Sequence, residues 1–251
     1  DRELAAGFLF SEGVLKDPDD LGAIAWCTDP AASHPENVVT VTLTGPSALA
    51  LADALASRRQ VVANSSCGVC GRASIEALTV GRPAAVSAFR PSAQVIAGLP
   101  AALRARQAIF TRTGGLHAAG LFDAAGALLD SAEDVGRHNA VDKVIGRRIL
   151  REALPACDTI LFVSGRTSFE ILQKAWLAGI PCVASVSAPS SLAVDLAREA
   201  GMTLLGFVRD GGFNIYTGTV AGTDAATDGG KAAAIDPGTD AGTEPGPAAG
   251  R

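Results

Sequence analysis

The residues best suited to chemistry are Cys67 and Cys70, which lie two residues apart in segment 64–72, Asn-Ser-Ser-Cys-Gly-Val-Cys-Gly-Arg. A glycine follows each cysteine, so the backbone can turn there without a side chain in the way. A strand-like pattern precedes the segment and a helical pattern follows it, which predicts a loop that carries two thiols. The positive charge of Arg72 favours the thiolate over the thiol.

A single Cys-x-x-Cys pair is compatible with half of a zinc site, a redox dithiol, a nucleophile with a helper, or chance. Zinc needs two further ligands, usually a second pair of Cys or His at short spacing. The remaining cysteines and histidines all stand alone: Cys27, Cys157, Cys182, His34, His117 and His138. A thioredoxin-like pair belongs between a strand and a long helix, which this glycine-rich loop fits poorly. We therefore favour thiol chemistry on an exposed loop and expect no permanently bound metal.

The composition describes a globular chain in a reducing compartment. Its 251 residues, 48% of them hydrophobic, are enough for a well-buried core. No apolar run is long enough to cross a bilayer, so we expect no membrane partner. Five cysteines are too few, and odd in number, for a disulfide scaffold. A helical pattern begins within the first residues, so we expect the natural chain to extend further at the N-terminus.

The net charge of −5 is unevenly distributed. Residues 218–251 contain five acidic and two basic residues, which leaves 19 basic and 21 acidic residues in 1–217. A body that is nearly neutral gives no electrostatic reason to expect nucleic acid as a partner. The segment 218–251 has almost no large apolar side chains, and we expect it to be disordered.

The hydrophobic periodicity predicts an α/β protein. We expect residues 1–90 to form a truncated N-terminal α+β part with the cysteine loop, and residues 91–217 to form an α/β cofactor-binding domain. Repeated alternation of strand and helix predicts a mainly parallel sheet with helices on both faces. The expected helices are 1–12, 45–59, 92–106, one with Val141, Val144, Ile145 and Ile149 on its inner face, 169–178 and 192–200. The expected strands are 37–44, 116–123, 127–134, 159–163, 182–186 and 203–208.

Three turns that follow predicted parallel strands carry similar polar residues. They are 163–168 (Val-Ser-Gly-Arg-Thr-Ser), 186–191 (Val-Ser-Ala-Pro-Ser-Ser) and 207–212 (Phe-Val-Arg-Asp-Gly-Gly). Ligands of open parallel sheets gather at the carboxyl ends of the strands, and helix N-termini attract anions. One serine-rich turn is ordinary helix capping, but three polar turns on one edge, two of them with an arginine, favour an anionic ligand. The sequence contains neither a P-loop nor a Gly-x-Gly-x-x-Gly pattern.

Segment 133–139, Glu-Asp-Val-Gly-Arg-His-Asn, concentrates two acids, an arginine and an imidazole at the start of a predicted helix. Helix capping and a surface ion pair would explain it without any function. The functional reading makes it a polar wall of the same crevice, with His138 exchanging a proton near neutral pH. His117 lies on a strand of small residues, where either a ligand approaches or the ring is a satisfied core residue.

Taken together, these blocks resemble the formate dehydrogenase accessory sulfurtransferase family, FdhD/NarQ. The resemblance covers nearly all of residues 1 to 217 and runs through 6–13 (Ala-Gly-Phe-Leu-Phe-Ser-Glu-Gly), 67–71 (Cys-Gly-Val-Cys-Gly), 133–143 (Glu-Asp-Val-Gly-Arg-His-Asn-Ala-Val-Asp-Lys), 164–166 (Ser-Gly-Arg) and 206–207 (Gly-Phe). It implies a three-layer α/β/α, cytidine-deaminase-like fold with a mixed sheet, without deaminase activity. It also implies a homodimer in the cytoplasm.

The activity that the resemblance implies is sulfur carriage. A cysteine desulfurase loads sulfur onto the carrier, which transfers it to the Mo-bis(molybdopterin guanine dinucleotide) cofactor, or its tungsten counterpart, before insertion into formate dehydrogenase. By position, Cys67 resembles the persulfide-bearing residue and Cys70 its helper. The cofactor-binding segment corresponds to Phe207, Val208, Arg209, Asp210, Gly211 and Gly212. Other members carry a basic-Pro-Gly pattern where this chain has Arg-Asp-Gly-Gly.

Two other functions compete with sulfur carriage. A zinc deaminase needs His-x-Glu together with Pro-Cys-x-x-Cys. Only His34-Pro35-Glu36 matches the first pattern, in a proline-rich loop, and Cys67 follows a serine. A non-catalytic chaperone that binds a guanine nucleotide or cofactor, with structural thiols, remains the alternative.

Overall fold

The computed structural model describes residues 1–29, 31–49, 89–209, 211–222 and 231–233. A seven-stranded sheet forms the centre of this part, in the order β4-β3-β5-β6-β7-β8-β9. Its strands are β3 (His117–Phe122), β4 (Leu128–Asp134), β5 (Ile160–Val163), β6 (Cys182–Ser185), β7 (Thr203–Arg209), β8 (Gly212–Thr217) and β9 (Lys231–Ala233).

The sheet is mixed, as the family resemblance implied. Only the pairs β5–β6 and β6–β7 are parallel, and the other pairings in this sheet are antiparallel. The prediction of a mainly parallel sheet was therefore wrong. The hairpins β3–β4 and β7–β8 extend the parallel centre on both sides, and a short hairpin connection can only join antiparallel strands.

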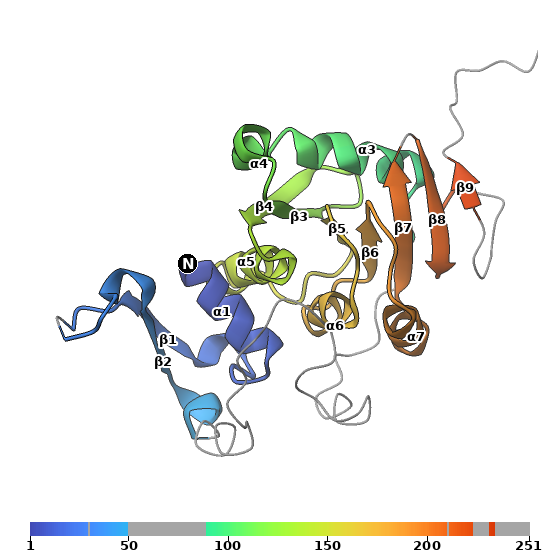
Figure 1. Cartoon of the computed structure of the whole chain (residues 1–251). Coiled ribbons are helices and arrows are strands. Elements are labelled where there is room, and N and C mark those ends of the chain that lie inside the picture. The colour runs from blue at the N-terminus through green and yellow to red at the C-terminus, as the bar shows by residue number, and fades with distance from the viewer. Residues whose placement is uncertain (30, 50–88, 210, 223–230, 234–251) are drawn as a thin grey trace, which may run out of the picture.

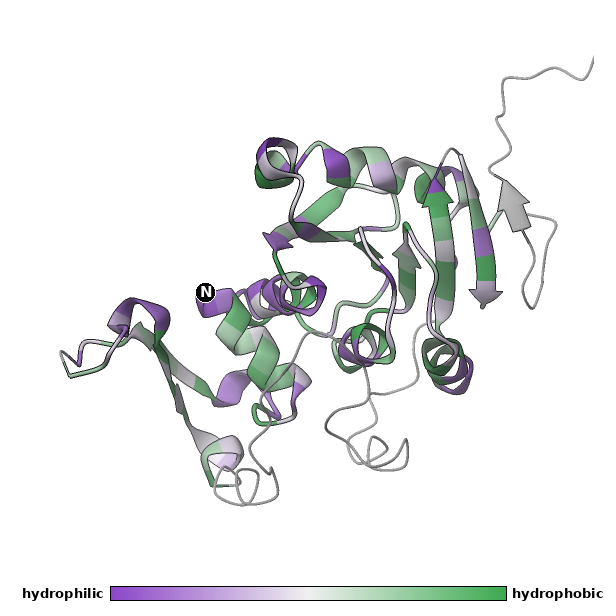
Figure 2. Cartoon of the chain, in the orientation of Figure 1, coloured by the Kyte–Doolittle hydropathy of each residue, from purple (hydrophilic) through white to green (hydrophobic). Residues whose placement is uncertain are grey.

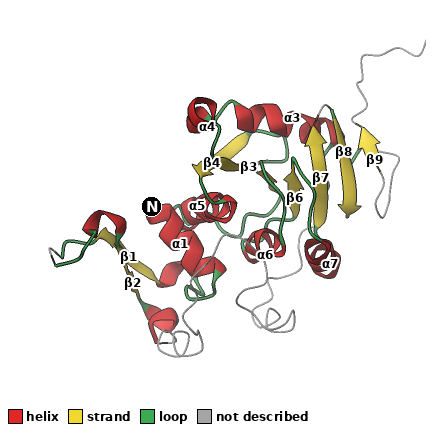
Figure 3. Cartoon of the chain, in the orientation of Figure 1, coloured by secondary structure: helices red, strands yellow, loops and turns green. Residues whose placement is uncertain are grey.

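Helices cover both faces of the sheet (Figures 1 and 3). The helices α3 (Ala93–Arg104) and α4 (Ala108–Thr113) lie on one side, and α1 (Arg2–Ser11), α5 (Arg137–Leu150), α6 (Phe169–Leu177) and α7 (Ser191–Ala200) lie on the other. Alternate strand residues serve the two layers: Phe162 and Ala184 pack with the α3 side, whereas Leu161 and Val183 pack with the α5 side. The central strands are hydrophobic along most of their length (Figure 2) because both faces are covered.

The N-terminal part shares its core with the rest of the molecule. Ala6, Leu15 and Ile24 belong to the same buried cluster as α5 and α6. The face of α1 that is buried consists of small residues, and a Cβ built on Gly7 would lie 1.9 Å from the carbonyl oxygen of Asp142. Gly146 on α5 is equally close to α1, since its Cβ would lie 1.8 Å from the carbonyl oxygen of Glu3. The two helices therefore cross in backbone contact.

A buried ion pair joins the same three helices. Lys174 on α6 donates to both carboxylate oxygens of Asp142 on α5, at 2.7 and 2.8 Å, and Ser11 on α1 donates to Asp142 at 2.9 Å. Burial raises the pKa of Asp142, and the Lys174 charge and these hydrogen bonds oppose that effect. Because each member would be a costly unpaired group alone, the trio fixes how α1, α5 and α6 pack.

The hairpin of β1 (Leu21–Trp26) and β2 (Val39–Leu43) projects to one side of the molecule (Figure 1). Only β2 was predicted. Residues 45–49 are helical, as expected for the start of the predicted helix 45–59, and the rest of that helix lies outside the described residues. No helix in the described ranges has both the length and the hydrophobicity needed to cross a membrane.

The predicted disordered tail begins too early at residue 218. Val220 is buried, the N–H of Ala221 donates to the carbonyl oxygen of Pro91, and the N–H of Ala93 donates to the carbonyl oxygen of Ala221, both at 2.9 Å. Further along, β9 pairs with β8. Residues 218–222 therefore complete the region around the start of α3, and most of the remaining tail lies outside the described residues.

Candidate functional site

The three polar turns lie together at the carboxyl edge of β5, β6 and β7, as predicted. The turns after β5 and β6 are joined by a bridge between Thr167 and Pro189, and the N–H of Ser190 donates to the carbonyl oxygen of Thr167 at 2.9 Å. The N–H of Phe207, near the end of β7, donates to the carbonyl oxygen of Ser187 at 3.2 Å. These bonds join the turn after β5, the turn after β6 and the end of β7 into one continuous edge, which we call the rim.

The two serine-rich turns differ in what their capping serines do. Ser190 accepts a hydrogen bond from the N–H of Ala193 and so caps α7 in the ordinary way. Ser168 precedes α6 but does not cap it, and its hydroxyl oxygen lies 2.9 Å from Nε2 of His138. His138 is the second residue of α5, so the N-termini of α5 and α6 meet at this hydrogen bond. Like α6, α5 has no side-chain cap.

Arg137 and His117 flank Gly165 in the turn after β5. A Cβ on Gly165 would lie 3.3 Å from Nδ1 of His117 and 3.8 Å from Cδ of Arg137, so the glycine gives both side chains room to approach. Nε of Arg137 is buried and has no hydrogen-bond partner among the described residues. The hydroxyl of the fully buried Thr167 is likewise unpartnered there. An arginine with an unpartnered Nε beside two helix N-termini makes this part of the sheet edge positively polarised and suited to an anion.

His138 is a neutral imidazole at pH 7. Burial and, to a smaller extent, the positive charge of Arg137 lower its pKa to about 4, and the carboxylate of Glu170 opposes this shift. Of the two readings of segment 133–139, the functional one had His138 exchanging a proton near neutral pH, and the low pKa of this ring disagrees with it. The neutral ring instead positions Ser168 and holds the starts of α5 and α6 together.

The acid pair of segment 133–139 has a structural role. The carboxylate of Glu133 accepts from the N–H groups of Ile109 and Phe110, at 3.0 and 2.7 Å, and so caps α4 from a neighbouring strand. Asp134 accepts from the N–H of Gly136 and pairs with Lys143 at 2.5 Å. Burial raises the pKa of Asp134, but the hydrogen bonds from Lys143 and from this N–H together outweigh that effect, so the net shift of the pKa is downward.

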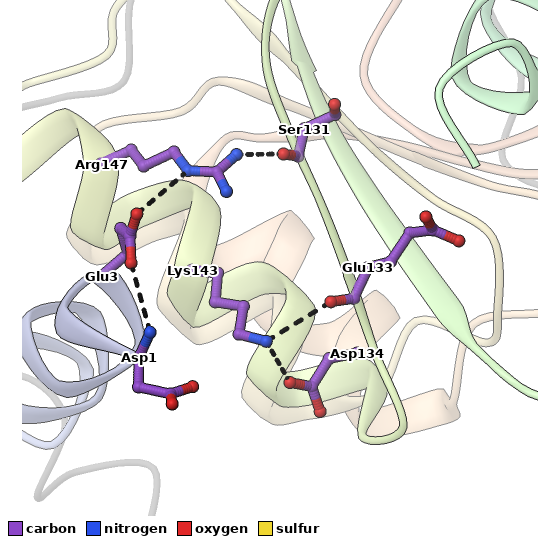
Figure 4. A network of polar contacts seen from close by, with 7 residues as sticks. All are labelled: Asp1, Glu3, Ser131, Glu133, Asp134, Lys143 and Arg147. Carbon is purple, nitrogen blue, oxygen red and sulfur yellow. Dashed lines mark hydrogen bonds and ion pairs between the residues drawn. The ribbon is translucent and has the colours of Figure 1, made fainter. Parts of the chain in front are cut away.

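Figure 4 shows how these residues reinforce the edge of the sheet. Lys143 donates to the carbonyl oxygen of Glu133 and Arg147 to that of Ser131, and Arg147 also lies 3.8 Å from the Glu3 carboxylate. Two cations one helical turn apart on α5 thus satisfy carbonyls of the edge strand β4. The capping explanation for this segment was correct for its acids, whereas Arg137 and His138 face the rim.

The predicted cofactor-binding segment is the bulged turn of the β7–β8 hairpin. Arg209 pairs with Gly212, and the register shifts between Gly206 and Arg209. Phe207 has a φ of 54°, a left-handed conformation that costs a non-glycine residue on the order of 1 kcal/mol or more. The Arg209 guanidinium lies 5.8 Å from the centre of the Phe207 ring. Strain of this kind is concentrated at binding sites.

The remaining residues of that segment differ in accessibility. Val208 is buried, Arg209 and Gly211 are exposed, Gly212 begins β8, and Asp210 lies outside the described residues. Arg166 on the turn after β5 is also exposed. The rim therefore has one partly buried arginine beside it, Arg137, and two exposed arginines, Arg166 and Arg209.

Two cavities border the α3–α4 segment. The larger, about 510 Å³, opens at the carboxyl edge of the sheet and is lined by His117, Ser164 and Val186 on the sheet side. The smaller, about 400 Å³, lies over β4 among the residues of Figure 4. Sequence reasoning did not find the α3–α4 wall, because α4 is a short helix whose cap comes from Glu133 on another element.

The predicted catalytic residues Cys67 and Cys70 lie outside the described residues. Of the cysteines that are described, Cys182 is fully buried, which raises the pKa of its thiol and makes it a poor nucleophile. Cys27 and Cys157 are free thiols. The described residues contain no cluster of three or more His, Cys, Asp or Glu side chains placed to bind a metal ion.

Comparisons with known proteins agree with these observations. The model of the FdhD/NarQ family matches residues 1–221. The chain is 50% identical over 223 residues to the sulfur carrier protein FdhD of Streptomyces avermitilis, covering 87% of this chain and 78% of that one. It is 46% identical over 217 residues to the protein of the same name from Sulfurisphaera tokodaii, covering 86% of this chain and 78% of that one.

A crystal structure from Desulfotalea psychrophila, described as a formate dehydrogenase accessory protein, superimposes with a TM-score of 0.64 at 25% identity. The match covers 86% of this chain and 76% of that one. The family match spans the rim, the helix starts around Arg137 and the segment with both loop cysteines. The chain therefore belongs to the FdhD/NarQ family.

Proposed function

We propose that this protein is a sulfur carrier that takes persulfide sulfur from a cysteine desulfurase onto Cys67. It passes that sulfur to a molybdenum or tungsten bis-guanine-dinucleotide cofactor destined for formate dehydrogenase. The observation that carries the proposal is a family match that includes Cys67-Gly68-Val69-Cys70 and spans an anion-suited sheet edge in the same chain. The names of the relatives, sulfur carrier proteins, and of the solved structure, a formate dehydrogenase accessory protein, point the same way.

The loading step is an exchange between sulfur atoms. The Cys67 thiolate attacks the terminal sulfur of the desulfurase persulfide, a new S–S bond forms at Cys67, and the desulfurase cysteine leaves as a thiolate. The reaction needs an accessible thiolate, which the neighbouring glycines and Arg72 favour. Among the described cysteines, Cys182 is ruled out as the acceptor by its burial.

Delivery uses the second cysteine. The Cys70 thiolate attacks Sγ of Cys67, a Cys67–Cys70 disulfide forms, and the terminal sulfur leaves as hydrosulfide, which the metal of the cofactor takes up. Two thiolates supply the two electrons that reduce the sulfur, so a dithiol reductant must reopen the disulfide before the next cycle. A carrier that first relays the persulfide to Cys70 leaves the sulfur at the same oxidation level, so its release from Cys70 as hydrosulfide forms the same disulfide and needs the same reductant.

The cofactor is held as a substrate at the rim. Its phosphates suit Arg137 and the starts of α5 and α6, and the strained turn Phe207–Gly212 supplies a second contact region on the same edge. We further propose that the protein acts as a homodimer in the cytoplasm, in keeping with the family resemblance.

Reconstitution of formate dehydrogenase tests the proposal. Apo-enzyme, cofactor, desulfurase and cysteine are combined with the wild-type carrier, Cys67→Ala, Cys70→Ala or the control Cys157→Ala. Wild type and control should activate the enzyme, Cys67→Ala should not, and Cys70→Ala should load sulfur but deliver it poorly. Activation by Cys67→Ala at the wild-type rate would instead favour a nucleotide-binding chaperone whose thiols are structural.

A further inference from the structure

The edge strand β9 leads the end of the chain to the rim. It pairs antiparallel with β8, and its last residue, Ala233, lies opposite Gly212, the first residue of β8. Because β8 is in turn antiparallel to β7, β9 runs in the direction of β7, toward the carboxyl edge of the sheet (Figure 1). The segment that follows Ala233 therefore starts beside the turn Phe207–Gly212 of the rim.

The two exposed arginines of the rim are close to this starting point. Arg209 pairs with Gly212 in the β7–β8 hairpin, and Gly212 pairs with Ala233. Arg166 follows β5, which is three strand spacings from β8 in the sheet, or about 14 Å. Neither guanidinium forms an ion pair with another described residue. Both are therefore available to an anionic group that arrives from β9.

The segment after β9, residues 234–251, carries the opposite charge. Its acids, Asp236, Asp240 and Glu244, are spaced four residues apart, and its one basic residue is Arg251. Ile235 is the only large apolar residue in it, so charge is the main means by which this segment can bind the body of the protein. The family model ends at residue 221, so the segment lies outside the part of the chain that this model matches.

The length of the chain allows these acids to reach both arginines. An extended chain spans at most about 3.6 Å per residue. Asp236 can therefore reach points up to about 11 Å from Ala233, and Asp240 can reach points up to about 25 Å from it. Single ion pairs at a surface are weak, but a short tether holds a group at an effective concentration in the millimolar range. Tethering therefore favours contacts that free carboxylates would not maintain.

We propose that Asp236, Asp240 and Glu244 dock on the two exposed arginines and that the tail of the chain covers the rim in the free protein. The docking does not depend on the proposed function, but its consequence does. An anionic cofactor has to displace the tail from Arg209 and Arg166 before it can use them. Because surface ion pairs are weak, the tail lowers the affinity for such a ligand by about three- to tenfold and does not block its binding.

Arginine modification tests the docking on the full chain without any ligand. Wild type and Asp236→Asn/Asp240→Asn/Glu244→Gln are treated with phenylglyoxal, which reacts with accessible guanidinium groups, and the modified residues are identified by peptide mass spectrometry. Arg209 and Arg166 should react about threefold faster in the tail variant. Raising the ionic strength from about 0.01 M to about 1 M shortens the Debye length from about 30 Å to about 3 Å and should remove this difference.

The matched control removes three exposed acids elsewhere. Asp19 and Glu36 lie in the short 3-10 helices before β1 and β2, and Glu152 follows the end of α5 that is opposite the rim. Asp19→Asn/Glu36→Gln/Glu152→Gln changes the net charge by the same amount as the tail variant. Arg209 and Arg166 should therefore react in this control as fast as in wild type.

Equal reactivity of the two arginines in wild type and the tail variant at low ionic strength would overturn the docking, and so would the same acceleration in the control. Protection that is lost on dilution would assign the contact to the tail of another copy and would contradict the proposal as well. Calorimetric titration with GDP, which resembles the guanine nucleotide part of the proposed cofactor, should show three- to tenfold tighter binding by the tail variant. Unchanged GDP affinity would reject the competition.

Sulfur loading of Cys67 is measured on the same samples. Absence of loading while Arg209 and Arg166 remain protected would reject the sulfur carrier and leave the docking standing. Normal loading by proteins whose two arginines are equally reactive would have the opposite meaning.

Discussion

Substitution of Gly7 by alanine tests the α1–α5 crossing, which holds the first helix against the helix that presents Arg137. The added Cβ would lie 1.9 Å from the carbonyl oxygen of Asp142, and ordinary contact begins at 3.4 Å. The helices would have to separate by about 1.5 Å, because a backbone carbonyl in a helix has no alternative rotamer. That shift would also disturb the hydrogen bond from Ser11 to Asp142.

The expected magnitude follows from three effects. Overpacking costs about 1–3 kcal/mol, and loss of one hydrogen bond costs about 0.5–1.5 kcal/mol. Alanine is a better helix former than glycine by about 1 kcal/mol, which offsets part of the loss. We therefore expect Gly7→Ala to lower the free energy of unfolding by about 0.5–3.5 kcal/mol. Gly146→Ala should also be destabilising, since its Cβ would lie 1.8 Å from the carbonyl oxygen of Glu3.

Gly98→Ala is the matched control. Gly98 lies within α3, is exposed, and a Cβ there would meet no atom within 4 Å. It gains the same helix propensity without a clash, so its free energy of unfolding should rise by about 0.5–1 kcal/mol. Urea unfolding followed by circular dichroism measures all three variants. Equal stabilisation by Gly7→Ala and Gly98→Ala would refute the backbone contact between α1 and α5.

Three other substitutions test the rim and the cap of α4. His138 is protonated below about pH 6.5 in the unfolded chain but only below about pH 4 when folded, so unfolding takes up a proton between these values and stability falls as the pH decreases. His138→Gln should reduce this loss of stability at low pH by on the order of 1–2 kcal/mol after allowance for partial exposure, whereas the exposed control His34→Gln should not reduce it. Urea unfolding as a function of pH measures the effect. Identical pH profiles for wild type and His138→Gln would contradict this prediction. Phe207→Gly should relieve the strain of the left-handed backbone and leave the free energy of unfolding unchanged or up to about 1 kcal/mol higher. Calorimetry should show weaker GDP binding by this variant. Clear destabilisation would refute the strain argument. Glu133→Ala should remove the cap of α4 and lower the free energy of unfolding by about 1 kcal/mol. Hydrogen exchange of the Phe110 amide should become faster, and an unaltered exchange rate there would show that the cap is dispensable.

Most of the parallel centre could be predicted from the sequence, because its signals are local. Fully buried strands such as β5 read as short apolar runs, and α5 has its inner residues at helical spacing. The strand β8 also carries a local signal, since its buried and half-buried residues alternate strictly, and it was overlooked. Polar and apolar residues do not alternate in the sequence of β1, and most of its residues are exposed, so no hydrophobic pattern predicted this strand.

The candidate site was predictable in position but not in detail. The carboxyl-edge rule brought the turns after β5, β6 and β7 together correctly. That rule could not show that Glu133 caps α4, or that Ser168 forms a hydrogen bond with His138 in place of capping α6. These pairings join residues 23 to 30 positions apart, and only the folded chain brings them into contact. The wall of the larger cavity that contains Arg104, Gln107 and Phe110 was missed for the same reason.

The sulfur acceptor is the central claim, and peptide mass spectrometry tests it most directly. The full chain is incubated with a cysteine desulfurase and cysteine, alkylated and digested without reductant. The account predicts one added sulfur atom on the peptide that contains Cys67, absent in Cys67→Ala and present in Cys70→Ala. Sulfur found on Cys157 or Cys27 instead, or no adduct on any cysteine, would contradict it.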